Sequence, residues 1–259
     1  MSTSAPKNLE RFDSGTLLTK HTSITTLSFV ERVIEKYFSE VSDDGLELNE
    51  NDYFKIVKAA QDELNSSETA FKIVEQVKDD LSRFLDDSKY LVQSNLYLRA
   101  TRPIQGSEES IGWHRESFYG PNLEECVNIW TPIKNVTKDN TLHFIPGSHL
   151  IDDKDIKTER TVSLKTAKGD LRNKIGFLYE PKKILSGINL KNSRPLMVPF
   201  GSSGIFKGSL IHGSAINNCK KIRFSVDFRV IADKNYKSAE TKKFHVASNR
   251  PYFLPFREL

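Results

Sequence analysis

Three residues, His114, Glu116 and His212, have the types and the spacing of a metal site. His114 and Glu116 are two positions apart, so in an extended strand both side chains point to the same face. Alone, such a pair is more typical of a surface salt bridge, but His212 follows 98 residues later at the end of a strand-like segment. Two histidines and one carboxylate form the ligand set that holds Fe(II) and leaves coordination positions open. The sequence therefore predicts an iron site built from these three residues.

An arginine eleven residues after His212 has the chemistry to bind an organic acid beside such a metal. Arg223 lies in an otherwise apolar, strand-like segment, and Ser225 shares its face. A charged side chain on a buried strand is costly unless it has a partner. Arg223 and Ser225 together are suited to bind a carboxylate through charge-assisted hydrogen bonds.

The elements that must position these residues change character near residue 88. Before it, apolar residues recur at helical spacing in three stretches, at 30–41, 54–64 and 70–85. After it, the pattern predicts short strands separated by Gly, Pro and Asn turns, at 90–99, 126–133, 142–145, 196–198, 204–206 and 222–231. Short strands without helices between them predict an antiparallel barrel or sandwich and not a doubly wound sheet.

The domain organisation follows from the same pattern. A chain of 259 residues is long enough for one full core. We expect a flexible arm over residues 1–26, where Ser and Thr are frequent, and a single domain over 27–259. Within this domain we expect a helical support (27–88), a barrel core (89–231) with a polar insertion over one mouth (150–192), and a C-terminal tail (232–259).

Composition and charge exclude several classes of protein. No run of 18 or more apolar residues exists, which argues against a membrane protein, and no apolar segment of a secretory signal stands near residue 1. Two cysteines, Cys126 and Cys219, are too few for a disulfide scaffold or a cysteine-based zinc site, and they favour a reducing cytoplasm. Residues 89–259 carry 28 basic and 16 acidic side chains, but the basic ones are scattered. We therefore expect a small anionic ligand and not a nucleic acid.

The motifs, taken in order, resemble those of the Fe(II)/2-oxoglutarate-dependent dioxygenases. They are closest to the phytanoyl-CoA dioxygenase-like branch, which includes ectoine hydroxylase. The similar segments are Gln93-Ser94, Trp113-His114-Arg115-Glu116, Asn128 to Ile133, Leu142 to His149, and Gly201 to Val230. The resemblance implies a mainly β fold with flanking α elements: a double-stranded β-helix, also called a jelly-roll or cupin-like barrel, with the N-terminal helices packed on it.

The resemblance also implies roles for individual residues. His114, Glu116 and His212 would ligate Fe(II), and 2-oxoglutarate would chelate the iron while Arg223 receives its distal carboxylate. Dioxygen would then oxidise the cosubstrate to succinate and CO2 as the substrate is oxidised. Further cosubstrate-binding candidates are Ser214, Ser225, Trp130, Gln93 and Tyr97. Candidates for contact with the substrate, on the open side of the iron, are Ser117, Tyr119 and His143, the last of which is equally compatible with a place in the core.

Glu116 stands where this branch more often has aspartate, although other clades of the superfamily use glutamate. A carboxylate of either length argues against a halogenase, which leaves this position empty for chloride. We expect an oxygenase that hydroxylates a small polar or anionic metabolite, whether amino-acid-like, a sugar or carrier-bound. Two alternatives stay open at this point: the same metal site performing desaturation, cyclisation or epimerisation, and a catalytically silent barrel that binds a ligand. The oligomeric state is left open.

Overall fold

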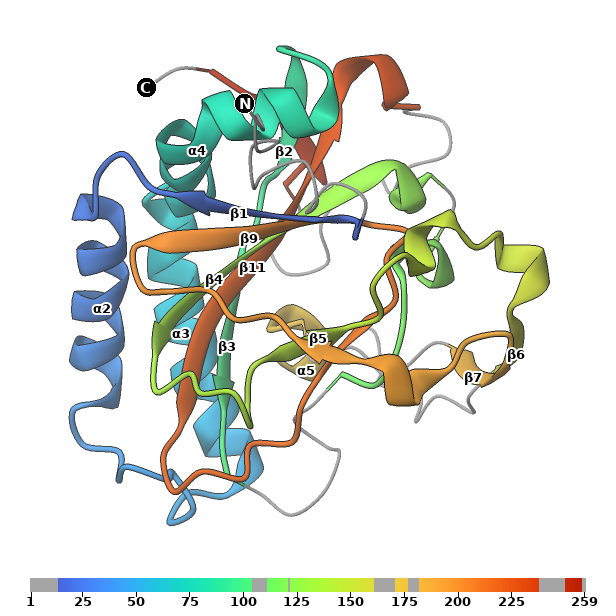
Figure 1. Cartoon of the computed structure of the whole chain (residues 1–259). Helices are drawn as coiled ribbons and strands as arrows, with labels where there is room; N and C mark the ends of the chain where they lie inside the picture. Colours follow the sequence, from blue (N-terminus) through green and yellow to red (C-terminus); the bar gives the residue numbers. More distant parts are fainter. Residues whose placement is uncertain are drawn as a thin grey trace, which may run out of the picture.

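Three helices precede the β-rich part of the chain in the computed structural model, which describes residues 14–103, 111–120, 122–160, 171–176, 182–237 and 250–257. The helices are α2 (Thr25–Phe38), α3 (Glu50–Ser66) and α4 (Thr69–Leu85). They pack on one another and against one face of the large sheet (Figure 1). The three predicted helical stretches are therefore confirmed, and among the described residues no helix is long and apolar enough to cross a membrane.

Two antiparallel sheets form the body of the fold. The larger has the order β1-β9-β4-β11-β2-β12, with β3 also paired to β11, and the smaller has the order β10-β5-β8. The bounds of the larger sheet are β1 (Thr16–Lys20), β2 (Tyr90–Gln93), β3 (Tyr97–Thr101), β4 (Cys126–Lys134), β9 (Ser202–Lys207), β11 (Arg223–Ala232) and β12 (Phe253–Pro255). Those of the smaller are β5 (Leu142–Phe144), β8 (Arg194–Pro195) and β10 (His212–Ser214). This is the predicted mainly β double-stranded β-helix with N-terminal helices packed on it.

The remaining elements are short. They are η1 (Glu116–Phe118), η2 (Leu123–Glu125), η3 (Ser148–Leu150), η4 (Asp153–Asp155), β6 (Lys157–Arg160), α5 (Leu171–Lys174), β7 (Lys182–Ser186), η5 (Leu190–Asn192) and η6 (Asp233–Asn235). β6 and β7 pair as a hairpin that projects from the barrel at the right of Figure 1. The predicted insertion thus carries its own hairpin and a helical turn.

The alternation of side chains along β11 sets the two sides of the large sheet. Phe224, Val226, Phe228 and Val230 belong to the main hydrophobic core, which the sheet shares with the helices. Each such buried side chain stabilises the fold by about 1.5–3 kcal/mol. The alternate residues from Arg223 to Arg229 are polar, and three of them, Arg223, Asp227 and Arg229, line a pocket inside the barrel. The strand therefore anchors the helices with one face and supplies chemistry with the other.

A smaller apolar cluster lies between the two sheets. It contains Trp130, Leu142, Phe144, Leu196, Val198, Phe206 and Leu210. These residues come from strands of both sheets and from the segments beside them. They hold the sheets together next to the polar interior of the barrel.

One predicted strand is interrupted. Residues 90–99 form two strands, β2 and β3, instead of one. The break is held by Asn65 of α3, whose amide group accepts a hydrogen bond from Leu96 N (2.9 Å) and donates one to Leu96 O (3.2 Å). An amide side chain thus takes the place of a neighbouring strand at this point.

The expectation of a flexible arm over residues 1–26 is wrong for residues 16–26. Thr16–Lys20 form β1, which pairs with β9 along its length, and α2 already begins at Thr25. β-Branched threonines suit an edge strand. The strand was not predicted because its apolar and polar residues do not alternate, and it is stabilised by backbone pairing with β9. Residues 1–13 lie outside the described part of the chain.

The C-terminal tail also joins the fold. β12 pairs with β2 along Phe253 to Pro255, and Ser94 N donates to Tyr252 O (3.0 Å). The tail therefore extends the large sheet at its far edge. Residues 238–249 lie outside the described part of the chain.

Candidate active site

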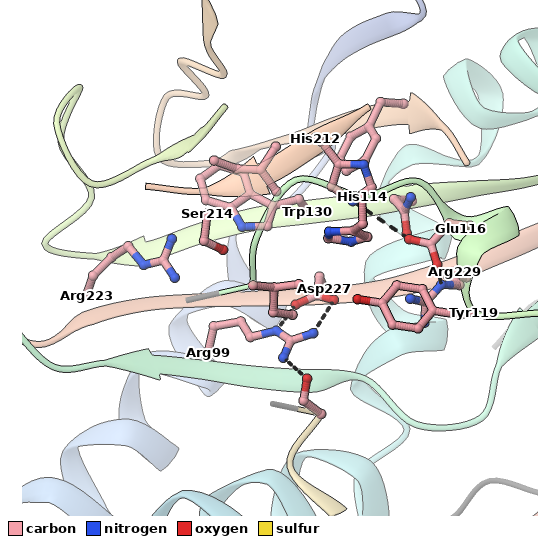
Figure 2. A pocket seen from close by; sticks show the side chains of 15 residues that line it. Arg99, His114, Glu116, Tyr119, Trp130, His212, Ser214, Arg223, Asp227 and Arg229 are labelled. Atoms are coloured by element: carbon pink, nitrogen blue, oxygen red, sulfur yellow. Dashed lines mark hydrogen bonds and ion pairs between the residues drawn. The ribbon is translucent and has the colours of Figure 1, made fainter. Parts of the chain in front are cut away.

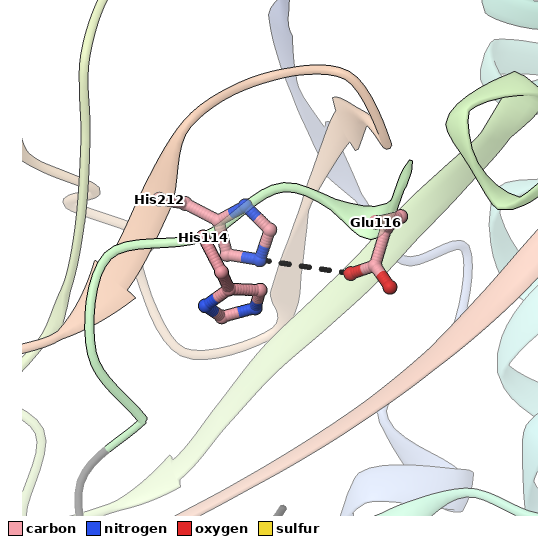
Figure 3. Close-up of side chains that lie close together, drawn as sticks. All are labelled: His114, Glu116 and His212. Atoms are coloured by element: carbon pink, nitrogen blue, oxygen red, sulfur yellow. Dashed lines mark ion pairs between the residues drawn. The ribbon is translucent and has the colours of Figure 1, made fainter. Parts of the chain in front are cut away.

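The two predicted histidine ligands face each other across an antiparallel bridge. His114 N donates to His212 O and His212 N donates to His114 O, both at 2.9 Å. The two imidazole centroids lie 4.3 Å apart. Glu116 begins η1, and its backbone N donates to Gly208 O (2.8 Å), so the carboxylate is fixed beside the same bridge. Figure 3 shows the three side chains converging from the two segments.

The ligand atoms of these three residues lie within 4.8 Å of one another, and all three residues are buried. Glu116 Oε1 is 3.7 Å from His212 Nε2. Each imidazole bonds through Nδ1 to a backbone carbonyl, His114 to Gly112 O (2.7 Å) and His212 to Leu210 O (2.8 Å). A carbonyl only accepts, so Nδ1 must carry the proton and Nε2 keeps a free lone pair. The residues present therefore fit a divalent iron: two imidazole nitrogens and one carboxylate oxygen are free to bind it.

The environment keeps the three ligands in the protonation state that a metal needs. Burial, followed by the nearby His212, lowers the pKa of His114 to about 3. Burial also lowers the pKa of His212. Burial by itself would raise the pKa of Glu116, but the positive charge of Arg229 outweighs it and the pKa is lowered. At neutral pH the histidines are neutral and the glutamate is ionised.

The pocket extends from these ligands along β11 to Arg223 (Figure 2). Arg223 is 2% exposed and donates to Thr101 Oγ1 (2.7 Å) and to Asn140 O (3.1 Å), while its Nε has no hydrogen-bond partner. Burial, followed by repulsion from Arg99, lowers the pKa of Arg223 to about 10, so it stays charged at neutral pH. A buried cation with an unused donor, at the far end of a pocket from a metal site, fits a carboxylate ligand.

An ion pair between the buried Arg99 and the half-buried Asp227 lines the pocket between its two ends. Arg99 of β3 binds Asp227 of β11 through Nε to Oδ1 (2.5 Å) and through Nη2 to Oδ2 (3.0 Å). The same guanidinium donates to Gly176 O and lies 4.8 Å from the centre of the Tyr97 ring. Gly176 has a φ of +73°, and a Cβ there would come within 2.3 Å of Tyr97, so only glycine fits this approach. Of its described residues, the insertion therefore contributes Gly176 to the lining of the pocket.

The structure places the cosubstrate candidates in three ways. Ser214 and Trp130 line the pocket, as does Arg223. Ser225 is fully buried on the same face of β11, and its Oγ has no hydrogen-bond partner. Tyr97 and Gln93 are not among the lining residues: Tyr97 packs under Arg99, and Gln93 binds Arg229 through its Oε1. These last two side chains support the pocket from outside it.

Of the three substrate candidates, only Tyr119 lies at the pocket, with its ring 5.2 Å from that of His114. Ser117 is the second residue of η1, where successive side chains turn by about 120°, and it faces a separate surface pocket beside Glu124. His143 follows Leu142 on β5; because Leu142 lines the pocket, His143 points to the other face. The structure therefore does not bring Ser117 or His143 to the metal ligands.

Several residues of the pocket were not predicted from the sequence, including Arg99, Asn128, Gly176, Asp227 and Arg229. Asp227 and Arg229 could have been predicted, because they lie on the same face of β11 as Arg223 and Ser225. Asn128 stands two positions before Trp130 on β4, and its buried Nδ2 has no hydrogen-bond partner. Nothing in the sequence pattern pointed to Gly176.

Comparison with known proteins agrees with this geometry. The sequence profile of the phytanoyl-CoA dioxygenase (PhyH) family matches residues 27–225. No curated protein matches the sequence significantly. Solved structures also share the fold, among them the three that follow. A non-heme monooxygenase, ThoJ in its apo form, has 18% identity and a TM-score of 0.54, over 86% of this chain and 76% of that one.

The second is EvdO2 from Micromonospora carbonacea var. aurantiaca complexed with 2-oxoglutarate, with 13% identity and a TM-score of 0.53, over 89% of this chain and 92% of that one. The third is the epimerase SnoN in complex with Fe3+, α-ketoglutarate and nogalamycin RO, with 12% identity and a TM-score of 0.51, over 97% and 98%. The family match covers most of the chain, and the iron-ligand triad is intact. This chain therefore belongs to the phytanoyl-CoA dioxygenase family of Fe(II)- and 2-oxoglutarate-dependent oxygenases.

Proposed function

We propose that the protein hydroxylates a small metabolite that carries a negative charge, with release of succinate and CO2. One observation carries this proposal: a buried set of iron ligands and a buried, partly unsatisfied Arg223 occupy the two ends of one pocket. With 2-oxoglutarate and dioxygen, bound Fe(II) supplies the oxidation of an otherwise unreactive C–H bond. His114, Glu116 and His212 would hold the metal, and Arg223 would bind the distal carboxylate of 2-oxoglutarate.

The other polar residues of the pocket would orient the cosubstrate and exclude water. Ser214 and Trp130 lie between Arg223 and the histidines, where they can contact the body of a bound keto acid (Figure 2). Asn128 Nδ2 and Ser225 Oγ are buried donors without partners, and unsatisfied buried donors are costly unless a ligand accepts their hydrogen bonds. Arg99 neutralises Asp227, which would otherwise repel a dianionic cosubstrate.

The charges in the pocket favour an anionic substrate. Arg99, Arg223 and Arg229 outnumber the two carboxylates, Glu116 and Asp227, by one. Fe(II) and the dianion of 2-oxoglutarate cancel each other, so the loaded pocket keeps one uncompensated positive charge. In a buried site such a charge favours a partner of opposite sign. A substrate with one carboxylate or with a phosphate ester satisfies this requirement.

The hairpin of the insertion supports the same conclusion from outside the pocket. Lys182 Nζ lies 5.0 Å from the centre of the Phe118 ring, and Phe118 stands two residues after Glu116. Ile156 and Ile184 pack in the same apolar cluster as Phe118. The insertion, with basic side chains such as Lys182 and Lys183, is therefore anchored beside η1, which carries Glu116. There it can attract an anionic substrate or the phosphopantetheine of a carrier. If it does, the apparent affinity for substrate falls as salt is added, and an affinity independent of salt would contradict this part of the proposal.

The first experiment tests the metal and the cosubstrate without a substrate. The metal-free protein is titrated anaerobically with Fe(II) and 2-oxoglutarate while the visible charge-transfer absorption is recorded. We expect a band in the wild type and none in His212→Ala, which removes one ligand. Folded wild-type protein that gives no band would contradict the proposal.

The second experiment addresses the substrate and the outcome. Succinate release is screened against small acids, each paired with its neutral amide, and we expect only the acids to stimulate it. The mass of the product then separates hydroxylation from the alternatives, because insertion of oxygen adds 16 Da to the substrate, desaturation or ring formation removes 2 Da, and epimerisation changes nothing. The shared fold with an epimerase makes this measurement necessary.

Both cysteines are free, and we place the enzyme in a reducing, cytoplasmic compartment on that ground.

A further inference from the structure

The two oxygens of the Glu116 carboxylate have different partners. Oε1 lies on the side of the histidines, 3.7 Å from His212 Nε2. Oε2 accepts a hydrogen bond from Arg229 Nε at 2.5 Å. Both side chains are almost completely buried, Glu116 at 1% and Arg229 at 7% exposure. Figure 2 shows Arg229 behind the carboxylate, on the side away from the imidazoles.

Arg229 is itself held by two further segments. Its Nη1 donates to Gln93 Oε1 (3.3 Å) and to Tyr252 Oη (3.2 Å), and its backbone N donates to the same Gln93 oxygen (3.1 Å). Gln93 ends β2, and Tyr252 directly precedes β12, which pairs with β2. The orientation of this guanidinium is therefore fixed from β2, β11 and the C-terminal segment together.

This arrangement answers a problem that a glutamate ligand creates. Glutamate has one more rotatable bond than aspartate, so its carboxylate can swing or present both oxygens to a metal. A bidentate carboxylate would occupy a coordination position that the cosubstrate or dioxygen needs. A short charge-assisted bond to Oε2 removes both freedoms, because it occupies one oxygen and directs the other.

We propose that Arg229 is a positioning residue that holds Glu116 as a one-oxygen metal ligand, and that Tyr252 of the C-terminal segment holds Arg229 in place. The metal site then includes a part of the chain that is far from the ligand motif in sequence. Glu116 then needs Arg229 beside it to bind the metal through one oxygen. The proposal rests on the metal-dependent function above and deepens it.

The test uses Co(II) binding to the full chain, because the visible spectrum of Co(II) reports both affinity and coordination geometry. In Arg229→Met, which is similar in length and uncharged, we expect Co(II) affinity to fall by about 10- to 100-fold, the usual effect of removing a partner of a metal ligand. The absorption of the bound Co(II) should also change in shape, since Glu116 is then free to bind through both oxygens. Wild-type affinity and spectrum in folded Arg229→Met would overturn the proposal.

A matched control separates positioning from general destabilisation. Arg102 is another buried arginine; it donates to Leu48 O (2.9 Å) and Gly45 O and lies 4.3 Å from the centre of the Tyr53 ring, outside the pocket. Arg102→Met should lower the melting temperature but leave the Co(II) affinity and spectrum unchanged. Equal losses of Co(II) affinity in Arg102→Met and Arg229→Met would overturn the proposal.

Tyr252→Phe keeps the proposal testable if Arg229→Met does not fold. This variant keeps the ring that packs edge-on against Phe253 and removes only the hydroxyl that binds Arg229. We expect a severalfold loss of Co(II) affinity with a spectral change in the same direction, and a wild-type result would overturn the role of Tyr252. Failure of the wild type itself to bind Co(II) would instead contradict the proposed function, so the two failures are distinguishable.

Discussion

Each side chain of the metal site has one polar atom that is hydrogen-bonded within the protein and a second polar atom that is available to bind the metal. The Nδ1 atoms of His114 and His212 bond to backbone carbonyls, and Glu116 Oε2 bonds to Arg229. The tautomers of both histidines and the rotamer of the glutamate are therefore set before a metal binds. This preorganisation lowers the entropy that metal binding would otherwise cost.

Arg223 gives the clearest prediction at the scale of single residues. Arg223→Gln removes a charge and the unused Nε donor from the far end of the pocket. Hydrogen bonds to charged groups contribute about 1.5–3 kcal/mol each, so the Kd for 2-oxoglutarate should rise at least about tenfold. The charge-transfer band, followed as 2-oxoglutarate is added to the Fe(II)-loaded variant, measures this change.

The affinity of the same variant for metal alone serves as its control. Arg223 touches none of the three metal ligands, so Co(II) binding without 2-oxoglutarate should stay at the wild-type value. An unchanged Kd for 2-oxoglutarate would show that Arg223 does not bind the cosubstrate.

The three metal ligands were predicted correctly, because two histidines and a carboxylate at this spacing have few other uses. Arg223 was singled out because a charged side chain on an apolar strand is costly without a partner. The structure places Arg223 at the pocket, and its role in binding the cosubstrate stays a prediction. Ser117 could not be placed in this way. Its direction depends on the 3-10 turn that starts at Glu116, and local sequence does not reveal that turn.

At the scale of elements, β11 carries most of the polar chemistry of the pocket. Arg223, Asp227 and Arg229 stand on one face of this strand, and β3 supplies Arg99 opposite Asp227. The period of two in a strand fixes which residues share a face, so this row was predictable once Arg223 was assigned. The facing direction of β5 was not predicted, because a histidine suits either a polar pocket or a partly buried outer face; the structure puts Leu142 at the pocket and leaves His143 partly exposed on the other face.

The Arg99–Asp227 pair leads to a prediction that belongs to these two strands. Arg99→Met or Asp227→Leu alone leaves a charge in the pocket without its ion-pair partner, and each should lower the free energy of unfolding by about 3–5 kcal/mol. The double variant replaces the pair by apolar groups and should recover most of this loss. Urea unfolding of the four proteins measures the coupling.

Additive losses in that cycle would show that the two side chains do not stabilise each other. The Kd for 2-oxoglutarate gives a second, independent readout. It should rise most in Arg99→Met, which leaves the negative charge of Asp227 facing the dianion, and less in the double variant.

At the scale of the whole molecule, buried histidines couple stability to pH. His21 is 4% exposed and bonds through Nε2 to Ser203 Oγ at 2.7 Å, and burial lowers its pKa to about 4. Burial lowers the pKa of His114 to about 3 and that of His212 in the same direction. In the unfolded chain all three titrate near 6.5.

The sign of the pH dependence follows from these shifts. Below pH 6.5 the unfolded chain binds protons that the folded chain does not, so the metal-free protein should lose stability as pH falls from 7 towards 4. Above pH 7 this contribution is complete and constant. Urea unfolding of metal-free protein at pH 8, 7, 6 and 5 measures the slope, and equal stability at pH 7 and pH 5 would contradict the prediction. His21→Gln removes one of the titrating groups outside the metal site and should make the slope shallower.

Much of the fold was predictable from periodicity, because the change from helical to strand-like spacing near residue 88 reflects the change from helices to sheets in the structure. The parts that were not predicted depend on long-range pairing. β1 is held by β9, nearly 190 residues later, and β12 by β2, about 160 residues earlier. Neither pairing leaves a local signal. The positioning of Glu116 by Arg229 and Tyr252 has the same origin, since its members come from three distant segments.

The backbone bridge between His114 and His212 also has an evolutionary consequence. The whole insertion, residues 150–192, lies between these two positions in the chain, yet the bridge is closed by two hydrogen bonds that involve no side chain of the insertion. Descendants of such a protein can lengthen, shorten or exchange this stretch without displacing the imidazoles. For protein engineering, this stretch is therefore a place to alter what enters the pocket while the two imidazoles stay bridged, provided that the exchange keeps the bond from Arg99 to Gly176 O and the packing of Ile156 and Ile184 on Phe118.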